Sequence, residues 1–135
     1  VTTILVVAVA WTLKKNWKFL LVVLLIYAAG MSAELAGKAF INHPDPPVVY
    51  HRYILPFALP SSGVQTGNSY PSGHSYRTVF LAVLLWPLAK YRNQKMAIAA
   101  YVALMLFSRV SLGEHWVSDV IGGGLLGIIL NKNKF

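Results

Sequence analysis

Two short stretches of the chain place histidines beside groups that bind anions. The first is Pro71-Ser72-Gly73-His74, and the second begins at Ser108-Arg109 and continues to His115 and Asp119. Histidine is the side chain best suited to proton transfer or nucleophilic attack near neutral pH. A neighbouring arginine offers a planar fork for phosphate oxygens. The two stretches therefore predict a site for phosphoryl-transfer chemistry.

In the second stretch, the histidine and the aspartate are spaced for one face of a helix. His115 and Asp119 are four residues apart, so their side chains are neighbours if a helix starts near Trp116. A carboxylate there accepts the Nδ1 proton, leaves Nε2 as the nucleophile and stabilises the positive charge that develops on attack. Arg109 ends the preceding apolar segment, and we expect it to fold back towards the same point.

The first stretch opens a predicted helix after a polar loop. Ser72 and Gly73 stand where free backbone N–H groups and the helix dipole favour an anion. Glycine also lets the backbone approach a phosphate closely. His74 follows directly and is placed to protonate a departing alkoxide or phosphate. Nucleophile, acid, anion cradle and cationic clamp are thus all represented.

The composition indicates the membrane as the setting of this chemistry. The chain has 135 residues, of which 56% are hydrophobic and 12% charged, and its mean hydropathy is +0.57. A soluble domain carries about 25% charged residues. The absence of cysteine excludes disulfides and thiolate metal sites. The net charge of +8 comes from basic residues between apolar runs, which indicates membrane topology and not nucleic-acid binding.

Apolar segments give the fold class. We expect an all-α polytopic transmembrane bundle with five segments at most, forming one membrane-embedded phosphatase domain over residues 1–135. The first segment is too short to span a bilayer, and the sequence opens at Val1 without methionine, so we interpret it as the end of a truncated helix. The segments cover residues 1–13, 19–40, 74–89, 96–112 and 116–130.

The charges sort between the two ends of this predicted bundle. Alternate connections of a helical bundle lie on the same side of the membrane. Two such connections and the tail are basic, and the positive-inside rule assigns their side to the cytoplasm. All histidines and carboxylates lie near the opposite face. We therefore expect a multi-pass protein of the cell membrane whose active site faces the extracytoplasmic side. The basic groups are Lys14, Lys15 and Lys18, then Lys90, Arg92 and Lys95, then Lys132 and Lys134.

The one long connection runs from Asn42 to Tyr70 and contains five of the seven prolines. These prolines forbid a continuous helix. Its apolar middle, residues 50–59, suits the membrane interface. A long loop beside a site often acts as a lid or substrate guide, and a simple re-entrant connection explains the sequence equally well.

Several further residues have a structural interpretation. His43 and His51 lack motif support, and we interpret them as surface or interfacial residues. Glu34 and Lys38 are spaced to neutralise each other on a helix. Arg77 suits a structural ion pair better than a phosphate contact. Small residues let helices approach closely, which we expect of Gly122, Gly123, Gly124 and Gly127, while Trp11, Trp17, Trp86 and Trp116 suit an interfacial belt.

Taken together, these stretches resemble the type-2 phosphatidate phosphatase superfamily, the lipid phosphate phosphatases. The family pattern is Lys-x6-Arg-Pro, then Pro-Ser-Gly-His, then Ser-Arg-x5-His-x3-Asp. The second and third motifs match at every fixed position, and the resemblance covers residues 38–130.

The resemblance implies a role for each matched residue. His115 would be the nucleophile that forms a phosphohistidine, Asp119 its orienting partner and His74 the general acid. The residues implied to hold the phosphate are Lys38, Ser72, Gly73 and Arg109. The implied activity is hydrolysis of a terminal phosphate of a lipid phosphate or diphosphate, such as phosphatidate, phosphatidylglycerol phosphate or polyprenyl diphosphate. No metal or other cofactor is implied, and the partners are the bilayer and the lipid substrate, without nucleic acid.

The first motif departs from the family pattern at one position. Lys38 is followed after six residues by Asp45-Pro46, where the pattern has Arg-Pro. A carboxylate at that position would repel a phosphate dianion. Two alternatives follow: the chain is a catalytically weak or silent protein that binds phospholipid headgroups, or Asp45 points away and Arg52 or Arg77 takes over the phosphate contact.

Overall fold

The computed structural model describes residues 2–52 and 67–131, which form five α-helices. The helices are α1 (Thr2–Lys14), α2 (Trp17–Phe40), α3 (Gly73–Leu85), α4 (Arg92–Ser111) and α5 (Val117–Asn131), and two short 3₁₀ helices, η1 (Val48–Tyr50) and η2 (Trp86–Leu88), accompany them. Each helix covers one of the apolar segments expected from the sequence. The all-α fold class is therefore confirmed.

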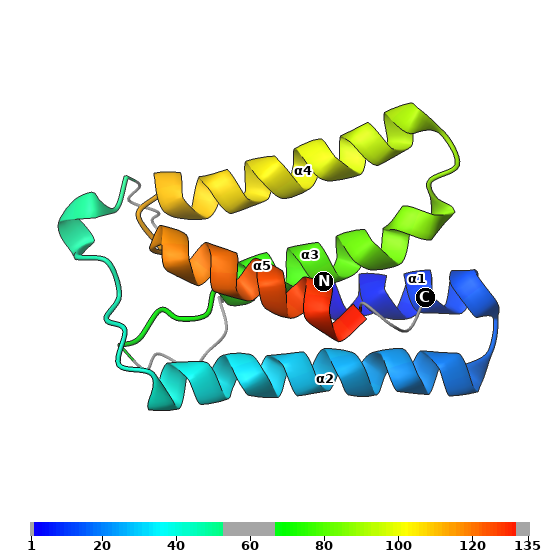
Figure 1. The fold of residues 1–135 in the computed structure, drawn as a ribbon, viewed down its shortest axis with the longest axis horizontal. Coiled ribbons are helices and arrows are strands. Elements are labelled where there is room, and N and C mark those ends of the chain that lie inside the picture. The colour runs from blue at the N-terminus through cyan, green and yellow to red at the C-terminus, as the bar shows by residue number, and fades with distance from the viewer. Residues whose placement is uncertain (1, 53–66, 132–135) are drawn as a thin grey trace.

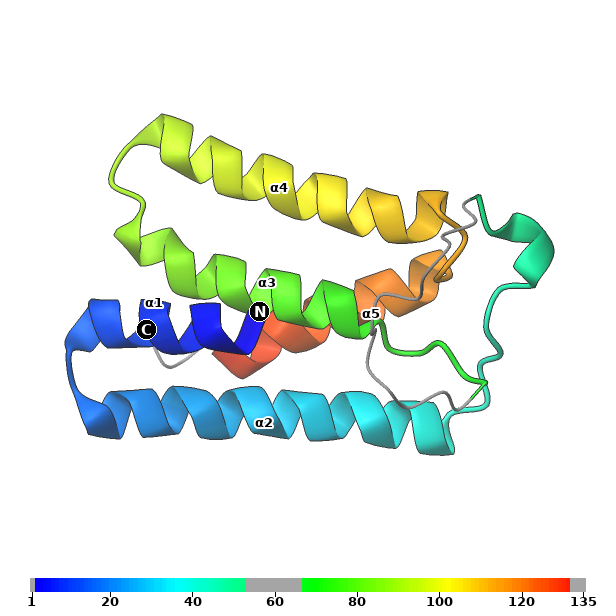
Figure 2. The same cartoon turned by 180° about the vertical axis from the view of Figure 1, so that it is seen from behind.

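The helices form a bundle whose two ends differ in character (Figures 1 and 2). The α1–α2 and α3–α4 connections lie together at one end. The long connection after α2 and the α4–α5 turn lie at the other. This arrangement confirms that the two basic connections share one end. Lys132 and Lys134 of the tail lie outside the described residues.

The core lies where α1, α2 and α3 meet. An aromatic cluster forms its centre, with the rings of Tyr27 and Phe80 5.2 Å apart in an edge-on arrangement. The Tyr76 hydroxyl donates a hydrogen bond of 2.8 Å to the backbone carbonyl of Tyr27, so its polar tip is satisfied inside the core. A Cβ at Gly30 would overlap the Tyr76 ring, which explains why α2 has a glycine at this contact. The other buried members of the core are Val6, Ala10, Val23 and Leu84.

Glycines on α5 allow that helix to pack against α3. A Cβ at Gly127 would lie 2.9 Å from the backbone oxygen of Tyr76, and a Cβ at Gly123 would overlap the backbone oxygen of Ser72. Both glycines are buried. The expectation of close helix packing is confirmed for these two glycines, whereas Gly122 lies against the Tyr70 side chain and Gly124 meets only Val79 at 3.8 Å. The start of α3 is thus fixed against the first turns of α5.

The outer surface of the bundle is apolar. Helix α2 has 24 residues, and its most apolar 18-residue window has a mean hydropathy of 2.1, with only 22% of that window buried. Its length of about 36 Å exceeds the roughly 30 Å of a bilayer core. Among the described helices it alone is long and apolar enough to cross a membrane, while α1 and α5 are shorter apolar helices. Large apolar side chains such as Leu104, Phe107 and Ile129 also face outward, as lipid contact requires.

The long connection is described only at its two ends. These ends are held together, because the backbone N–H of Ser69 donates to the carbonyl of His43 at 2.9 Å. The Asn68 side chain also donates to the carbonyl of Lys38 at 3.0 Å. Most of the apolar middle, for which we expect an interfacial position, lies outside the described residues.

Candidate active site

The α4–α5 turn places the candidate nucleophile at the end of the bundle opposite the basic connections. Helix α4 ends at Ser111, and Gly113 follows with a left-handed φ of +77°. A Cβ at Gly113 would also overlap the backbone of Tyr50, so the turn needs a glycine for conformation and for space. His115 follows two residues later, and Trp116 separates it from the start of α5 at Val117.

His115 and Asp119 face each other as the helical spacing predicts. The His115 Nδ1 atom lies 3.5 Å from Asp119 Oδ2, and that oxygen also accepts a 2.8 Å hydrogen bond from the backbone N–H of Trp116. The Asp119 side chain is fully buried, while 13% of the His115 side chain stays exposed. A fixed carboxylate on Nδ1 leaves Nε2 as the atom available for attack.

The start of α3 is joined to the same helix turn. The backbone N–H of Ser72 donates to the carbonyl of Asp119 at 2.9 Å. The Ser72 hydroxyl is fully buried and caps α3, because it accepts hydrogen bonds from Ser75 N–H at 3.4 Å and Ser75 Oγ at 3.1 Å. The structure thus brings the two sequence motifs together, with the Ser72 side chain engaged in the cap.

His74 lies in the first turn of α3. It is half-buried, and it stands within electrostatic reach of His115, Arg109, Arg77 and Glu114. The two candidate catalytic histidines therefore belong to one charged cluster, although they are 41 positions apart in the chain.

Two of the candidate cations share one buried carboxylate. Glu34 is 1% exposed, and its Oε1 lies 3.1 Å from Lys38 Nζ, while its Oε2 accepts a 2.9 Å hydrogen bond from Arg77. A Cβ at Gly73 would overlap the same carboxylate, so this glycine packs directly on it. The expected Glu34–Lys38 pair is confirmed, as is the structural ion pair expected for Arg77.

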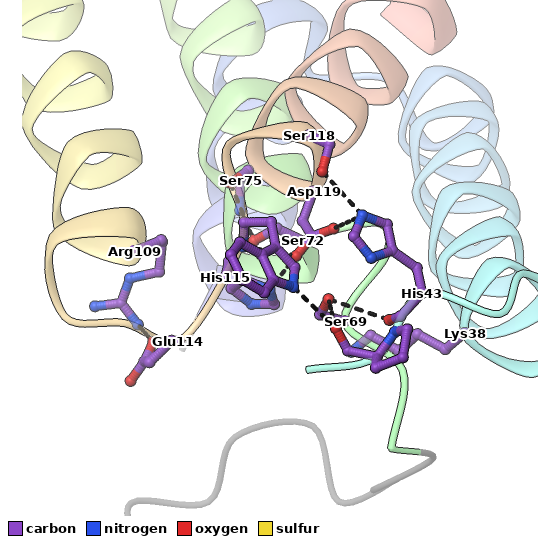
Figure 3. A network of polar contacts seen from close by, with 12 residues as sticks. Lys38, His43, Ser69, Ser72, Ser75, Arg109, Glu114, His115, Ser118 and Asp119 are labelled. Atoms are coloured by element: carbon purple, nitrogen blue, oxygen red, sulfur yellow. Dashed lines mark hydrogen bonds and ion pairs between the residues drawn. The ribbon is translucent and has the colours of Figure 1, made fainter. Parts of the chain in front are cut away.

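Arg109 is held by the residue before the nucleophile. Its guanidinium forms an ion pair with Glu114, and both side chains are largely buried. Figure 3 shows this pair on one side of His115, with Lys38 and His43 on the other side. Arg109 thus comes close to the turn, as expected, with its charge balanced by a carboxylate that lies next to the nucleophile in the chain.

His43 is partly exposed, as expected of a surface or interfacial residue, but its side chain also reaches the candidate site. Its Nε2 lies 2.9 Å from Ser118 Oγ and 3.4 Å from Asp119 Oδ1, so the imidazole contacts the candidate catalytic carboxylate (Figure 3). Sequence reasoning missed this contact because 76 positions separate His43 from Asp119 and no local spacing relates them. His51, the other histidine without motif support, is exposed as expected.

A cavity of about 400 Å³ opens beside His115. Tyr50, Arg52 and Trp116 line it, and the Arg52 backbone N–H donates to the carbonyl of Leu112 at 3.2 Å, which ties the loop to the α4–α5 turn. The Trp116 indole N–H also donates to the Pro44 carbonyl at 2.9 Å. The start of the long connection therefore forms one wall of this cavity.

Asp45, the departure from the first motif, is exposed. Its backbone N–H donates to the carbonyl of Gly67 at 3.2 Å, and Asp45 is not among the residues that line the cavity beside His115. Of the two arginines considered as its replacement, Arg77 is paired with Glu34 and Arg52 lines the cavity. The geometry favours Arg52.

The donor set of the cluster does not suit a metal ion. Within residues 2–52 and 67–131, no group of three or more histidine, aspartate or glutamate side chains is arranged to hold one. Cationic side chains stand among the carboxylates instead.

Comparison with known sequences gives a consistent result. A sequence model described as the PAP2 superfamily matches residues 2–131. Phosphatidylglycerophosphatase B of Bacillus subtilis is 37% identical over 75 residues, which are 49% of this chain and 37% of that protein. The lipid A 1-phosphatase of Rhizobium johnstonii is 33% identical over 101 residues, 73% of this chain and 39% of that protein. The chain thus spans about two fifths of the length of these relatives.

Among solved structures, the fold is similar to the crystal structure of a transmembrane PAP2-type phosphatidylglycerolphosphate phosphatase from Bacillus subtilis. The TM-score is 0.69 at 24% sequence identity, and the alignment covers 98% of this chain and 64% of that one. The bundle described above therefore has the same fold as that protein.

Proposed function

The chain belongs to the PAP2 superfamily, and from this premise we propose that it is a multi-pass membrane phosphatase that removes a terminal phosphate from a lipid phosphate or diphosphate. The observation that carries the proposal is the pair of His115 Nδ1 and Asp119 Oδ2 at 3.5 Å beside a cavity, with His74 in the same electrostatic cluster. An apolar bundle with this cluster at one end suits a substrate whose tails lie in the bilayer and whose phosphate lies at the surface.

The proposed reaction has two steps. In the first, His115 Nε2 attacks phosphorus, the bond from phosphorus to the lipid oxygen breaks, and His74 gives its proton to that oxygen. In the second, His74 takes a proton from water, the water oxygen attacks phosphorus, and the phosphorus–nitrogen bond of the phosphohistidine breaks. Asp119 keeps His115 in the correct tautomer and stabilises the imidazolium in between.

The phosphate would be held by cations that carboxylates position in its absence. Arg109 lies against Glu114, and Lys38 lies against Glu34. A phosphate dianion carries more charge than either carboxylate and competes for both cations. Gly73 and the N–H groups at the start of α3 complete the proposed cradle, since the dipole of α3 favours an anion there.

The names of the relatives suggest substrates for a first panel. Phosphatidylglycerol phosphate follows from the Bacillus protein, and a glycolipid 1-phosphate follows from the lipid A 1-phosphatase. Phosphatidate and a polyprenyl diphosphate extend the panel to other lipid phosphates. The end of the bundle that carries the candidate site would face the extracytoplasmic side, because the two basic connections lie at the opposite end.

The alternative is a silent protein that binds phospholipid headgroups. Asp45 is the feature that supports it, and the exposed position of Asp45 weakens that support. Release of phosphate from the panel by the purified chain in detergent distinguishes the two functions.

The experiment that tests the mechanism is His115→Ala. Turnover should fall by at least about a thousandfold, because the nucleophile is lost. Acid-quenched wild-type protein should contain an acid-labile phosphohistidine that the variant lacks, while both proteins should show the same melting temperature. Substantial turnover by His115→Ala would reject His115 as the nucleophile.

A further inference from the structure

We propose that His43 is a positioning residue that holds the Asp119 carboxylate so that its second oxygen stays directed at His115. This inference rests on the proposed function, since it concerns how the nucleophile is oriented. His43 Nε2 lies 3.4 Å from Asp119 Oδ1, and His115 Nδ1 lies 3.5 Å from Asp119 Oδ2 (Figure 3). One carboxylate thus lies between two imidazoles, one at each oxygen.

The burial of Asp119 explains why a second donor is needed. Its side chain is fully buried, and a buried carboxylate is costly unless donors compensate for the lost water. Oδ2 accepts from the backbone N–H of Trp116 at 2.8 Å, whereas Oδ1 and the facing His115 Nδ1 have no hydrogen bond of ordinary geometry among the described residues. The Ser69 hydroxyl also stabilises the carboxylate, so His43 acts beside it. The His43 Nε2 atom faces Oδ1, and a shift of a few tenths of an ångström would complete a hydrogen bond. Catalytic hydrogen bonds are often long before substrate binds.

Fixing both oxygens removes the rotation of the carboxylate. If Oδ1 were free, the carboxylate could turn and Oδ2 would leave the line to His115 Nδ1. The tautomer of His115 would then no longer be defined, and less of the protein would have Nε2 free for attack. In metal sites, loss of a comparable outer hydrogen bond to a ligand lowers affinity or activity by roughly ten- to a hundredfold.

The backbone of His43 anchors the loop. The effect of its side chain can therefore be tested without disturbing that anchor. The His43 N–H donates to Asn68 Oδ1 at 3.1 Å, and the His43 carbonyl accepts from Ser69 N–H at 2.9 Å. These bonds survive a change of side chain. The imidazole makes two further contacts: its Nε2 lies 2.9 Å from Ser118 Oγ, and its ring stacks on the Tyr70 ring with centroids 6.0 Å apart and planes at 12°.

Two substitutions distinguish the donor from the stack. His43→Phe keeps an aromatic ring against Tyr70 and removes Nε2, whereas His43→Gln keeps an N–H donor near the position of Nε2 and removes the ring. On a short-chain lipid phosphate, His43→Phe should lower kcat roughly ten- to a hundredfold with KM changed less than about twofold. His43→Gln should restore most of the lost kcat. His51→Phe, an exposed histidine of the same connection, is the matched control and should keep wild-type kcat.

Each opposite result overturns the inference. Wild-type kcat in His43→Phe would show that the donor has no effect on the nucleophile. An active Phe variant with an inactive Gln variant would assign the effect to the Tyr70 stack. A raised KM at unchanged kcat would make His43 a phosphate ligand instead of a positioning residue.

A second measurement does not depend on turnover. In ¹⁵N spectra of the imidazoles in detergent, His115 should carry its proton on Nδ1 in the wild type, and His43→Phe should shift it towards a mixture of tautomers. The chain has only four histidines, so single substitutions assign the signals. If the wild type releases no phosphate from any lipid of the panel, the proposed function fails, while the tautomer of His115 still decides the role of His43. An unchanged tautomer in His43→Phe would reject it.

Discussion

Among the described residues near the nucleophile, two carboxylates contact three basic side chains. Glu34 holds Lys38 and Arg77, and Glu114 holds Arg109. A cation without a partner would be costly in these partly buried positions. The pairs therefore keep the cations in place without substrate, and Glu114 lies beside the nucleophile, where an arriving phosphate would compete for Arg109.

At the scale of the single residue, Arg52 should contribute to phosphate binding. It lines the cavity that also contains His115, and loss of one charge-assisted contact should raise KM by about tenfold, or about 1.4 kcal/mol. Steady-state kinetics of Arg52→Ala on a short-chain lipid phosphate measure this. Arg92→Ala is the matched control, because Arg92 is exposed at the opposite end of the bundle. Equal KM values for the two variants would exclude the contact.

Asp45 gives the complementary prediction. It is exposed and is not part of the cavity wall, so Asp45→Arg should change kcat/KM by less than about threefold. A large gain would mean that Asp45 repels the bound phosphate, and a large loss would give this carboxylate a positive role. The same assay used for Arg52→Ala decides between these results.

Activity should also survive exhaustive chelation. The chemistry proposed uses imidazoles, one aspartate and fixed cations, and the described residues offer no cluster of metal ligands. Phosphate release should be the same before and after dialysis against EDTA. Loss of activity that added magnesium restores would contradict the mechanism.

At the scale of the elements, the contact between α3 and α5 connects stability to the site. Gly123 lies against the backbone oxygen of Ser72, and the Ser72 N–H in turn donates to the carbonyl of Asp119. The turn that starts α3 and the turn that carries the catalytic carboxylate are thus one packed unit. A change in the spacing of these two helices should act on the chemistry even where no substrate contact is altered.

Gly123→Ala tests this connection. The added methyl group would overlap backbone, which cannot move aside as a side chain can, so we expect a loss of roughly 1–3 kcal/mol of stability and a lower kcat. Gly124→Ala is the matched control on the same helix, because its Cβ would meet only Val79 at 3.8 Å. Thermal melting in detergent and kcat should both fall for Gly123→Ala and stay near wild type for Gly124→Ala. Equal behaviour of the two variants would refute the coupling.

At the scale of the whole molecule, the bundle separates a basic end from a catalytic end. The α1–α2 and α3–α4 connections lie together, and the candidate site lies at the other end of the helices (Figure 2). Between them the outer surface exposes large apolar side chains of α2, α4 and α5. An apolar belt between two polar ends fits a bilayer with one end in each aqueous phase.

The orientation of this bundle can be measured with single cysteines, because the chain has none of its own. Val48 is 79% exposed at the catalytic end, and Asn93 is exposed at the basic end. By the positive-inside rule, Val48→Cys should react with an impermeant maleimide on intact cells and Asn93→Cys only after permeabilisation. The reverse labelling pattern would place the site on the cytoplasmic side.

The sequence by itself determined the helices and the contacts within them. Apolar runs predicted all five helices, because an apolar surface must be contiguous to be buried or to face lipid. The helical period predicted the Glu34–Lys38 pair, since residues four apart on one helix are neighbours in any fold. The same spacing predicted the His115–Asp119 pair, although His115 lies in the turn two residues before α5 begins. The start of a helix after Ser72 was predicted as well. It was not foreseen that the phosphate contact expected of Ser72 competes with structural roles: its hydroxyl caps α3 and its N–H donates to the Asp119 carbonyl.

Only the tertiary structure decided which partners the site residues have across elements. His43 meets Ser118 although 75 positions separate them, and Arg77 meets Glu34 across 43 positions. Such contacts depend on how α2, α3 and α5 pack and on where the ends of the long connection are tied down. The spacing of residues along the sequence does not predict this packing. The packing depends on the shapes of whole helix faces, including the glycines that let α3 approach α5. For the same physical reason, Asp45 at a motif position lies exposed, while His43, two residues earlier and outside the fixed positions of the motif, contacts the catalytic carboxylate.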